Sequence, residues 1–147
     1  MRERDEPIPP DETLYRWVSV DQVNGTEVLP HAVDLACSSV NREKYWDDPF
    51  GSPPLTPEQN GLATTCEDSF PRGLALNEVP YEFFTVDDPT EDNDAHSEIR
   101  SGRKPSDEKP SGDRPQGRKP KSKAAKLQLR SSLAETMTVV KQPTAPA

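Results

Sequence analysis

The sequence predicts an α+β fold, with a small mixed or antiparallel sheet, one or two helices and a disordered basic tail. Three observations lead to this class. All nine aromatic residues lie between Tyr15 and Phe84, so the bulk of a core must come from the first hundred residues. Short β-branched or aromatic runs bounded by Pro, Gly and Asn recur in that part, as in sheet proteins. The last third combines Lys/Arg-Pro pentads with one stretch of helical spacing.

Five segments are expected to be strands. Residues 13–20 (TLYRWVSV) alternate large and polar side chains, and residues 81–86 (YEFFTV) are aromatic and β-branched, which makes them the clearest strand. Asn24-Gly25 predicts a turn before a short strand over 26–29. Residues 61–67 favour a fourth strand, and a further strand is expected to begin at Glu98.

The segments between these strands are less regular. Residues 1–12 are charged and Pro-rich and are expected to be an irregular lead-in, while residues 31–40 fit a helix or a strand equally well. The four prolines within residues 49–60 predict a loop. Residues 71–80 are expected to form a loop or a short helical turn, and residues 87–97 an acidic loop.

The chain divides into four parts on this reading. Residues 13–99 are expected to form the globular domain. Residues 100–120 hold Lys/Arg-Pro pairs at a period of five with nothing large and apolar from 101 to 123, which predicts a disordered linker. Residues 121–138 place Ala125, Leu129, Leu133 and Met137 four apart and predict a basic amphipathic helix. Residues 139–147 are expected to be a disordered end.

The net charge also changes sign near residue 100. Residues 1–99 carry 6 Lys+Arg and 22 Asp+Glu, a net of -16, whereas residues 100–147 carry 12 and 4, a net of +8; together they give -8. The acidic part should repel nucleic acid, and the basic part should attract it or fold back on the acidic part.

Compartment and redox state follow from what the first residues and the cysteines indicate. No apolar stretch follows the charged start, so no secretory signal is expected. No apolar run approaches the ~20 residues of a membrane span. We therefore expect a cytoplasmic protein with reduced Cys37 and Cys66, a disulfide between them being the open alternative.

The acidic loop does not match a calcium-binding loop. Asp92, Asp94 and His96 fit its first, third and fifth positions, but Ser97 and Arg103 stand where Gly and Glu are required. A solvated acidic loop is the favoured interpretation.

Zinc chemistry is also not indicated. The available ligands His31, Cys37, Cys66 and His96 are separated by 6, 29 and 30 residues, without the close Cys pairs of structural sites. His96-Ser97-Glu98 is similar to the His-x-Glu of zinc deaminases, but no Cys pair follows it. There is no Gly-rich phosphate loop and no Gly-x-Ser-x-Gly elbow. Neither a metal nor a cofactor is expected.

One scattered set of residues is similar to that of ADP-ribosyltransferases. Arg16, then Ser38 or Ser39, then Glu98 occur in the order of that family, in which Arg and Ser hold NAD and Glu stabilises the oxocarbenium ion. The set has no local signature. The alternative is that Arg16 is a strand residue paired with a nearby carboxylate.

Three segments resemble a group of small uncharacterised bacterial proteins: Leu14-Tyr15-Arg16, then Ser38-Ser39-Val40-Asn41-Arg42, then residues 88–96 as Asp-Pro-x-x-x-Asn-x-Ala-His. That group continues with a Lys/Ser/Ala-rich helix, which residues 121–127 resemble, the pentads being an insertion. The resemblance implies no known activity. It implies that the shared polar residues form one site and that the helix belongs to the domain.

The candidate ligand-binding residues are Arg16, Ser39, Arg42, Asn93, His96 and Glu98, and we expect Arg16, Arg42, Asn93 and His96 to converge in one cleft. For Arg42, neutralising nearby carboxylates is favoured over holding a ligand. The leading functional prediction is a small interaction or accessory protein with a protein partner. The alternatives are a small enzyme acting on a nucleotide or nucleic acid, and a nucleic-acid-binding tail that uses Arg103, Lys104, Arg118, Lys119, Lys121, Lys123, Lys126 and Arg130.

Overall fold

The fold comes from a computed structural model, which describes residues 6–35, 37–46, 60–72, 74–76, 79–91, 93–102 and 122–144. The predicted Pro-rich loop lies outside the described residues except for Asn60. The predicted pentad linker also lies outside them beyond Gly102.

Nine strands and one α-helix make up the described part of the chain. The strands are β1 (Leu14–Val18), β2 (Val23–Asn24), β3 (Glu27–Val28), β4 (Ser38–Arg42), β5 (Gly61–Thr65), β6 (Leu74–Leu76), β7 (Val79–Asp87), β8 (His96–Gly102) and β9 (Thr138–Lys141). The α-helix is α1 (Lys123–Ala134), and the short 3-10 turns are η1 (Val20–Gln22), η2 (Pro30–Ala32), η3 (Glu43–Tyr45) and η4 (Glu67–Ser69).

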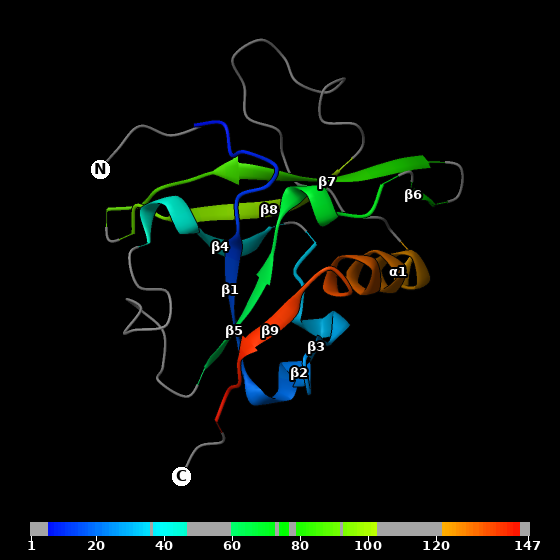
Figure 1. The fold of residues 1–147 in the computed structure, drawn as a ribbon. Coiled ribbons are helices and arrows are strands. Elements are labelled where there is room, and N and C mark those ends of the chain that lie inside the picture. The colour runs from blue at the N-terminus through cyan, green and yellow to red at the C-terminus, as the bar shows by residue number, and fades with distance from the viewer. Residues whose placement is uncertain are drawn as a thin grey trace.

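The strands form one sheet in the order β2-β3-β9-β5-β1-β4-β8-β7-β6, and every pair is antiparallel. Figure 1 shows β7 and β8 running across the direction of β1 and β5, which is the accumulated twist of a large sheet. The predicted α+β class with an antiparallel sheet is confirmed. The sheet has more strands than the sequence indicated.

Alternation of side chains between the two faces of the sheet explains the strands that were clearest from the sequence. In β1, Leu14 and Val18 are fully buried on the core face, and Tyr15 and Trp17 point to the other face. The turn at Asn24-Gly25 also forms as predicted. Gly25 has φ +62, a conformation that costs glycine little and other residues more, and it joins β2 to β3.

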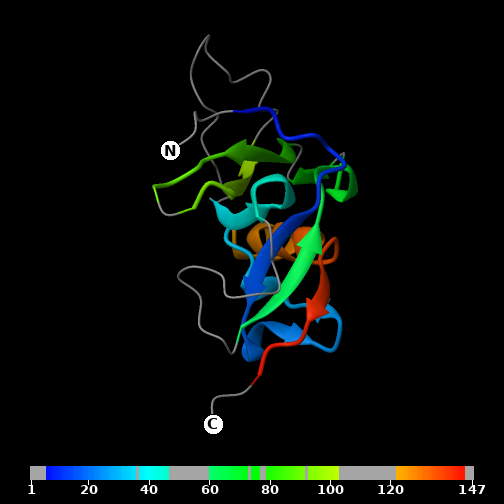
Figure 2. The same cartoon turned by 60° about the vertical axis from the view of Figure 1, so that its left-hand side comes forward.

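Helix α1 covers the core face of the sheet (Figures 1 and 2). It begins after Ser122, whose hydroxyl accepts a hydrogen bond from the Ala125 amide at 3.1 Å. Ala125, Leu129 and Leu133, the predicted stripe, are buried. The helix ends at Ala134, and Met137 is buried beyond it.

Two predictions about the domain's extent are wrong. The domain does not end at residue 99, because β8 continues to Gly102 and α1 supplies part of the core. The predicted disordered end from residue 139 instead forms β9, which pairs with β5 and β3. Gly61 makes this pairing possible, since a Cβ there would lie 2.2 Å from the Lys141 carbonyl oxygen.

The loop predicted over residues 71–80 is also wrong in part. Leu74–Leu76 form an edge strand, β6, that pairs with the start of β7. A three-residue strand has too little sequence pattern of its own and is set by the ladder of its neighbour. Residues 31–40, which the sequence left open, divide between turn η2 and strand β4.

Candidate functional site

Arg42 is fully buried and surrounded by carboxylates. Its Nε and Nη2 donate to both oxygens of Glu12, at 2.9 and 2.8 Å, and its Nη1 donates to Asp87 at 3.1 Å and to Glu6. The Tyr45 ring centroid lies 5.1 Å from the guanidinium carbon. Burial lowers the pKa of Arg42. The hydrogen bonds to Glu12, Glu6 and Asp87 raise it by more than burial lowers it, so the pKa lies above its usual value.

Glu6 completes this cluster from the lead-in of the chain. It accepts hydrogen bonds from the Tyr45 hydroxyl at 2.8 Å and from Lys44 Nζ at 3.0 Å, besides that from Arg42. Those three hydrogen bonds, with Tyr45 contributing most, lower the pKa of Glu6 to about 2. The Arg42 cluster, defined as Arg42 with Glu6, Glu12 and Asp87, therefore ties the lead-in to β4 and β7.

Arg16 is bound to backbone carbonyls. Its Nε and Nη2 donate to the Ala32 carbonyl at 3.1 and 2.6 Å, and its Nη1 donates to the Ser39 carbonyl at 2.7 Å. Burial lowers the pKa of Arg16, an effect that the charge of Asp34 opposes. Arg16 thus joins β1, η2 and β4, and its guanidinium is used for structure.

The register of the strands separates the candidate residues between two faces. Asn41 lies opposite both Tyr15 on β1 and His96 on β8, so these three share one face, which we call the outer face. Arg42 and Arg16 are their sequence neighbours and point to the opposite, core face. The predicted cleft shared by Arg16, Arg42, Asn93 and His96 is therefore wrong.

Ser39, His96 and Asp88 meet on the outer face. His96 Nε2 lies 3.4 Å from Ser39 Oγ, and His96 Nδ1 lies 2.7 Å from the Asp88 carbonyl oxygen and 3.6 Å from Asp88 Oδ2. Ser39 is exposed, whereas the His96 side chain is 21% exposed. Ser39 and His96 were expected at a site because the resemblance to the bacterial group implies it, whereas Asp88 lies in the same resembling segment and was not a candidate.

The remaining candidates lie near this group. Asn93 donates through Nδ2 to Asn41 Oδ1 at 2.6 Å and accepts from the Ala95 amide at 3.0 Å. Glu98 lies opposite Ser39 on β8 and binds Arg100 Nη2 at 2.6 Å.

Cys37 lies beside Glu98. Burial, followed by the charge of Glu98, raises the pKa of the Cys37 thiol. Cys37 and Cys66 are free cysteines in this structure.

Aromatic side chains also occupy the outer face, and the sequence reasoning assigned them only to a core. The Trp46 ring makes edge-to-face contacts with Tyr15 and Trp17, at centroid distances of 5.7 and 5.4 Å. The Lys141 ammonium lies 6.0 Å from the Trp17 ring.

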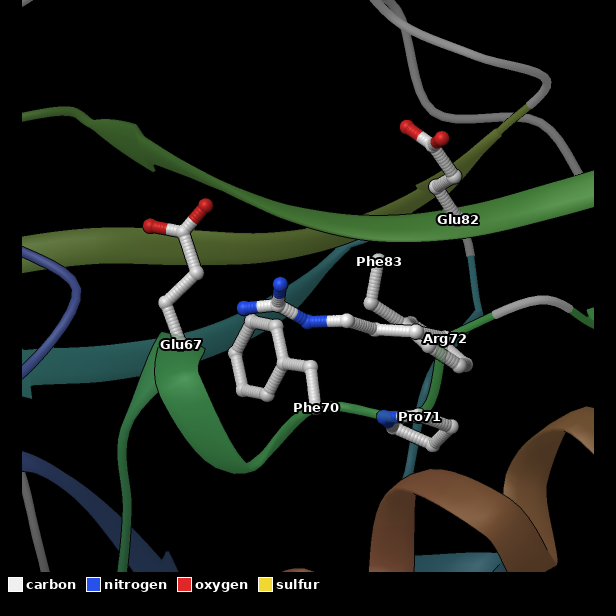
Figure 3. A pocket seen from close by; sticks show the side chains of 6 residues that line it. All are labelled: Glu67, Phe70, Pro71, Arg72, Glu82 and Phe83. Atoms are coloured by element: carbon white, nitrogen blue, oxygen red, sulfur yellow. The ribbon is translucent and has the colours of Figure 1, made fainter.

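A pocket of about 310 Å³ lies elsewhere, between η4 and β7, lined by Glu67, Phe70, Pro71, Arg72, Glu82 and Phe83 (Figure 3). We call it the acidic–aromatic pocket. Phe70 and Phe83 make an edge-to-face pair at 6.4 Å, and both are nearly fully buried. Figure 3 shows the carboxylates of Glu67 and Glu82 at either end of the group in that view. No single-residue motif marks this pocket in the sequence, because residues on η4 and β7 form it together.

Of the basic residues proposed for nucleic-acid binding, the described ones are Lys123, Lys126 and Arg130 on α1. Lys123 is exposed, and Lys126 and Arg130 are half-buried. Arg103, Lys104, Arg118, Lys119 and Lys121 lie outside the described residues.

Over the described ranges, no three His, Cys, Asp or Glu side chains come together as a metal site would require. The described part of the chain has one α-helix, α1, which is too short and too polar to cross a bilayer. Comparison of the chain with protein-family models, with curated proteins and with solved structures finds no match to any of them.

Proposed function

We propose that this chain is a small cytoplasmic interaction or accessory protein that binds a basic segment of a partner polypeptide in the acidic–aromatic pocket. The observation that supports the proposal is the composition of this pocket. Two carboxylates, Glu67 and Glu82, border a wall made by Phe70, Pro71 and Phe83. A Lys or Arg side chain has an apolar stem and a cationic end, which match these two parts.

The electrostatics of the pocket favour a cation over an anion. Glu82 is exposed and has no ion-pair partner within the described part of the chain. Arg72 is the pocket's own cation, and within the described ranges its carboxylate contact is a 3.9 Å approach to the exposed Asp68. An incoming ammonium or guanidinium group of a basic segment can instead meet the exposed Glu82 carboxylate. The net of -16 over residues 1–99 adds long-range attraction for such a segment.

The contacts of Arg16 and Arg42 weaken the alternative of a small enzyme that acts on a nucleotide or nucleic acid. A site for a nucleotide phosphate would need an available guanidinium fork. Arg42 directs four N–H donors at three carboxylates, and Arg16 directs its donors at two carbonyls.

The probe for the proposed pocket is a labelled peptide with the Lys/Arg-Pro sequence of residues 103–120. This choice follows from the fold, because β8 ends at Gly102 opposite Glu82, beside the pocket. To avoid competition from the chain's own copy, the protein is the full chain with every Lys and Arg of residues 103–121 replaced by Gln. We call this the tail-neutral chain.

Binding is measured by fluorescence anisotropy at low salt. Glu82→Lys in the tail-neutral chain should weaken binding about three- to tenfold, because one exposed attraction becomes a repulsion of similar size. Glu135→Lys is the matched control, since Glu135 is an exposed carboxylate at the end of α1. Equal weakening by both substitutions would mean that net charge alone attracts the peptide, and the pocket proposal would fail.

A further inference from the structure

We propose that Ser39 and His96 form a nucleophile and general-base pair that takes an acyl group from an ester. The pair lies on the outer face, away from the acidic–aromatic pocket, and this inference does not depend on the function proposed above. Three features of the structure support it: the proton positions on His96, the surroundings of Asp88, and the accessibility of Ser39.

The hydrogen bonds of His96 assign its proton. Nδ1 lies 2.7 Å from the Asp88 carbonyl oxygen. A carbonyl oxygen can only accept, so Nδ1 carries the hydrogen and donates it. In the neutral ring Nε2 is then the lone-pair nitrogen, and it faces Ser39 Oγ at 3.4 Å. The hydroxyl hydrogen of Ser39 therefore has a base directed at it, which is the arrangement that nucleophilic catalysis by serine requires.

Asp88 can stabilise the charge that develops on His96. When Nε2 takes a proton the ring becomes a cation, and Asp88 Oδ2 lies 3.6 Å from Nδ1. The Asp88 carbonyl holds the ring orientation while its carboxylate supplies the opposite charge. These are the two tasks of the third member of a serine triad.

Ser39 is accessible and its backbone is fixed. Ser39 is exposed to solvent, and its backbone carbonyl oxygen accepts a hydrogen bond from Arg16 Nη1 at 2.7 Å. The neighbouring Ser38 makes an instructive contrast. Ser38 is fully buried, with Oγ donating to the Asp34 carbonyl at 2.8 Å and accepting from the Asp34 amide at 2.9 Å. Of these two adjacent hydroxyls, only Ser39 is both reachable and paired with a base.

Neighbouring groups on the outer face favour an ester with an apolar or aromatic part. Asn41 is two residues from Ser39 on the same face of β4. Its Oδ1 accepts from Asn93, and its Nδ2 has no partner among the described residues. This amide is our candidate donor to the oxyanion. Trp17, half-buried on the same face of β1, supplies ring surface for the substrate.

The step balances without any further reactant. Ser39 Oγ adds to the ester carbonyl carbon while its proton moves to His96 Nε2. The bond from the carbonyl carbon to the leaving oxygen then breaks, and His96 returns the proton to that oxygen. The products are acyl-Ser39 and an alcohol or phenol. Water then gives a proton to the same nitrogen and adds to the acyl carbon. The bond from that carbon to Ser39 Oγ breaks, Oγ takes the proton back from Nε2, and the free acid leaves.

The test uses p-nitrophenyl acetate on the full chain, with p-nitrophenol release followed by absorbance and the acetylated residue located by peptide mass spectrometry. We expect acetyl on Ser39. His96→Ala should slow its formation about 100-fold or more, the usual contribution of a general base. Ser132→Ala is the matched control, because Ser132 is a half-buried hydroxyl that donates to the Gln128 carbonyl.

Ser39→Ala should abolish the labelled peptide, and Ser132→Ala should leave the rate unchanged. Thermal unfolding of each variant shows whether the fold is kept, and Asp88→Asn gives a second variant that retains the Asp88 carbonyl bond. It should lower the rate while the labelled residue stays the same. Acetyl on lysines only, or equal labelling of Ser39 after His96→Ala, would overturn the proposal. A Glu82→Lys chain should acylate normally, so this test and the peptide test fail separately.

Discussion

At the scale of single residues, Arg42 has the largest expected effect on stability. Its side chain is fully buried with Asp87 beside it, also fully buried, and with Glu12 nearly so. Removing the cation would leave these carboxylates without their opposite charge. Arg42→Ala should therefore lower the free energy of unfolding by about 3–5 kcal/mol, measured by urea denaturation.

Arg42→Lys separates charge from geometry. Lysine keeps the charge but cannot make the two-pronged contact with Glu12, so we expect an intermediate loss. Arg72→Ala is the control for removing an exposed arginine, and it should change the unfolding free energy by at most about 0.5 kcal/mol. A loss at Arg42 no greater than that at Arg72 would contradict the structural role.

The lowered pKa of Glu6 predicts that the fold loses stability over a defined range of acid pH. The pKa of Glu6 falls from 4.5 to about 2 in the folded chain because of the hydrogen bonds from Tyr45, Lys44 and Arg42. A carboxyl with a lowered folded pKa stabilises the fold fully above its unfolded pKa and loses that contribution as the pH falls through the folded pKa. The urea midpoint should thus fall between about pH 4.5 and 2. Glu6→Gln should start lower and show a smaller fall over that window, whereas equal falls would refute the link.

At the scale of elements, β9 explains why the C-terminal residues belong to the fold. Gly61 of β5 lies so close to β9 that an added Cβ would be 2.2 Å from the Lys141 carbonyl and 2.6 Å from the Pro143 nitrogen. Both are backbone atoms that cannot rotate away. Gly61→Ala should therefore displace β9 and destabilise the chain, by more than about 2 kcal/mol on the scale of overpacked sites.

Gly25→Ala gives the contrast for that prediction. At Gly25 a Cβ meets no atom within 4 Å, and the cost comes only from φ +62. That cost is about 1–2 kcal/mol for a residue other than glycine. Hydrogen exchange of the β9 amides should quicken much more in Gly61→Ala than in Gly25→Ala, whose turn reaches β9 through the bond from the Val139 amide to the Thr26 carbonyl. The reverse order would show that the contact between β5 and β9 is looser than described.

The same elements show what sequence alone could and could not predict. Strands β1, β5 and β7 were predicted because their side chains alternate or are β-branched and aromatic over five or more residues. Strands β6 and β9 were missed because each has at most four residues and depends on its partner for a ladder. The meeting of Ser39 with His96 depends on the register between β4 and β8, which composition does not encode.

The Arg42 cluster was predicted only in outline. A structural role for Arg42, neutralising nearby carboxylates, was favoured from the sequence, and one of those carboxylates is Asp87, at the start of the expected acidic loop. Glu6 and Glu12, however, lie 36 and 30 residues away in sequence, in the segment expected to be an irregular lead-in. Pairings of that separation follow from the topology of the sheet and carry no local signal.

At the scale of the whole molecule, the opposed charges of the two parts make stability depend on salt. A net of -16 over residues 1–99 repels itself, and the +8 of residues 100–147 offsets part of that repulsion through the covalent connection. The tail-neutral chain loses this offset without losing any contact of the described core. At low ionic strength its melting temperature should therefore lie several degrees below that of the unmodified chain, on the scale of about 1 kcal/mol.

Salt distinguishes this effect from a loss of specific contacts. At about 1 M ionic strength the Debye length falls to roughly 3 Å, and repulsion between exposed charges is largely screened. The difference in melting temperature between the two chains should then shrink to near zero, while Arg42→Ala, whose partners are buried, should keep most of its loss. A difference that persists undiminished in high salt would mean that residues 103–121 stabilise the fold by contacts other than charge.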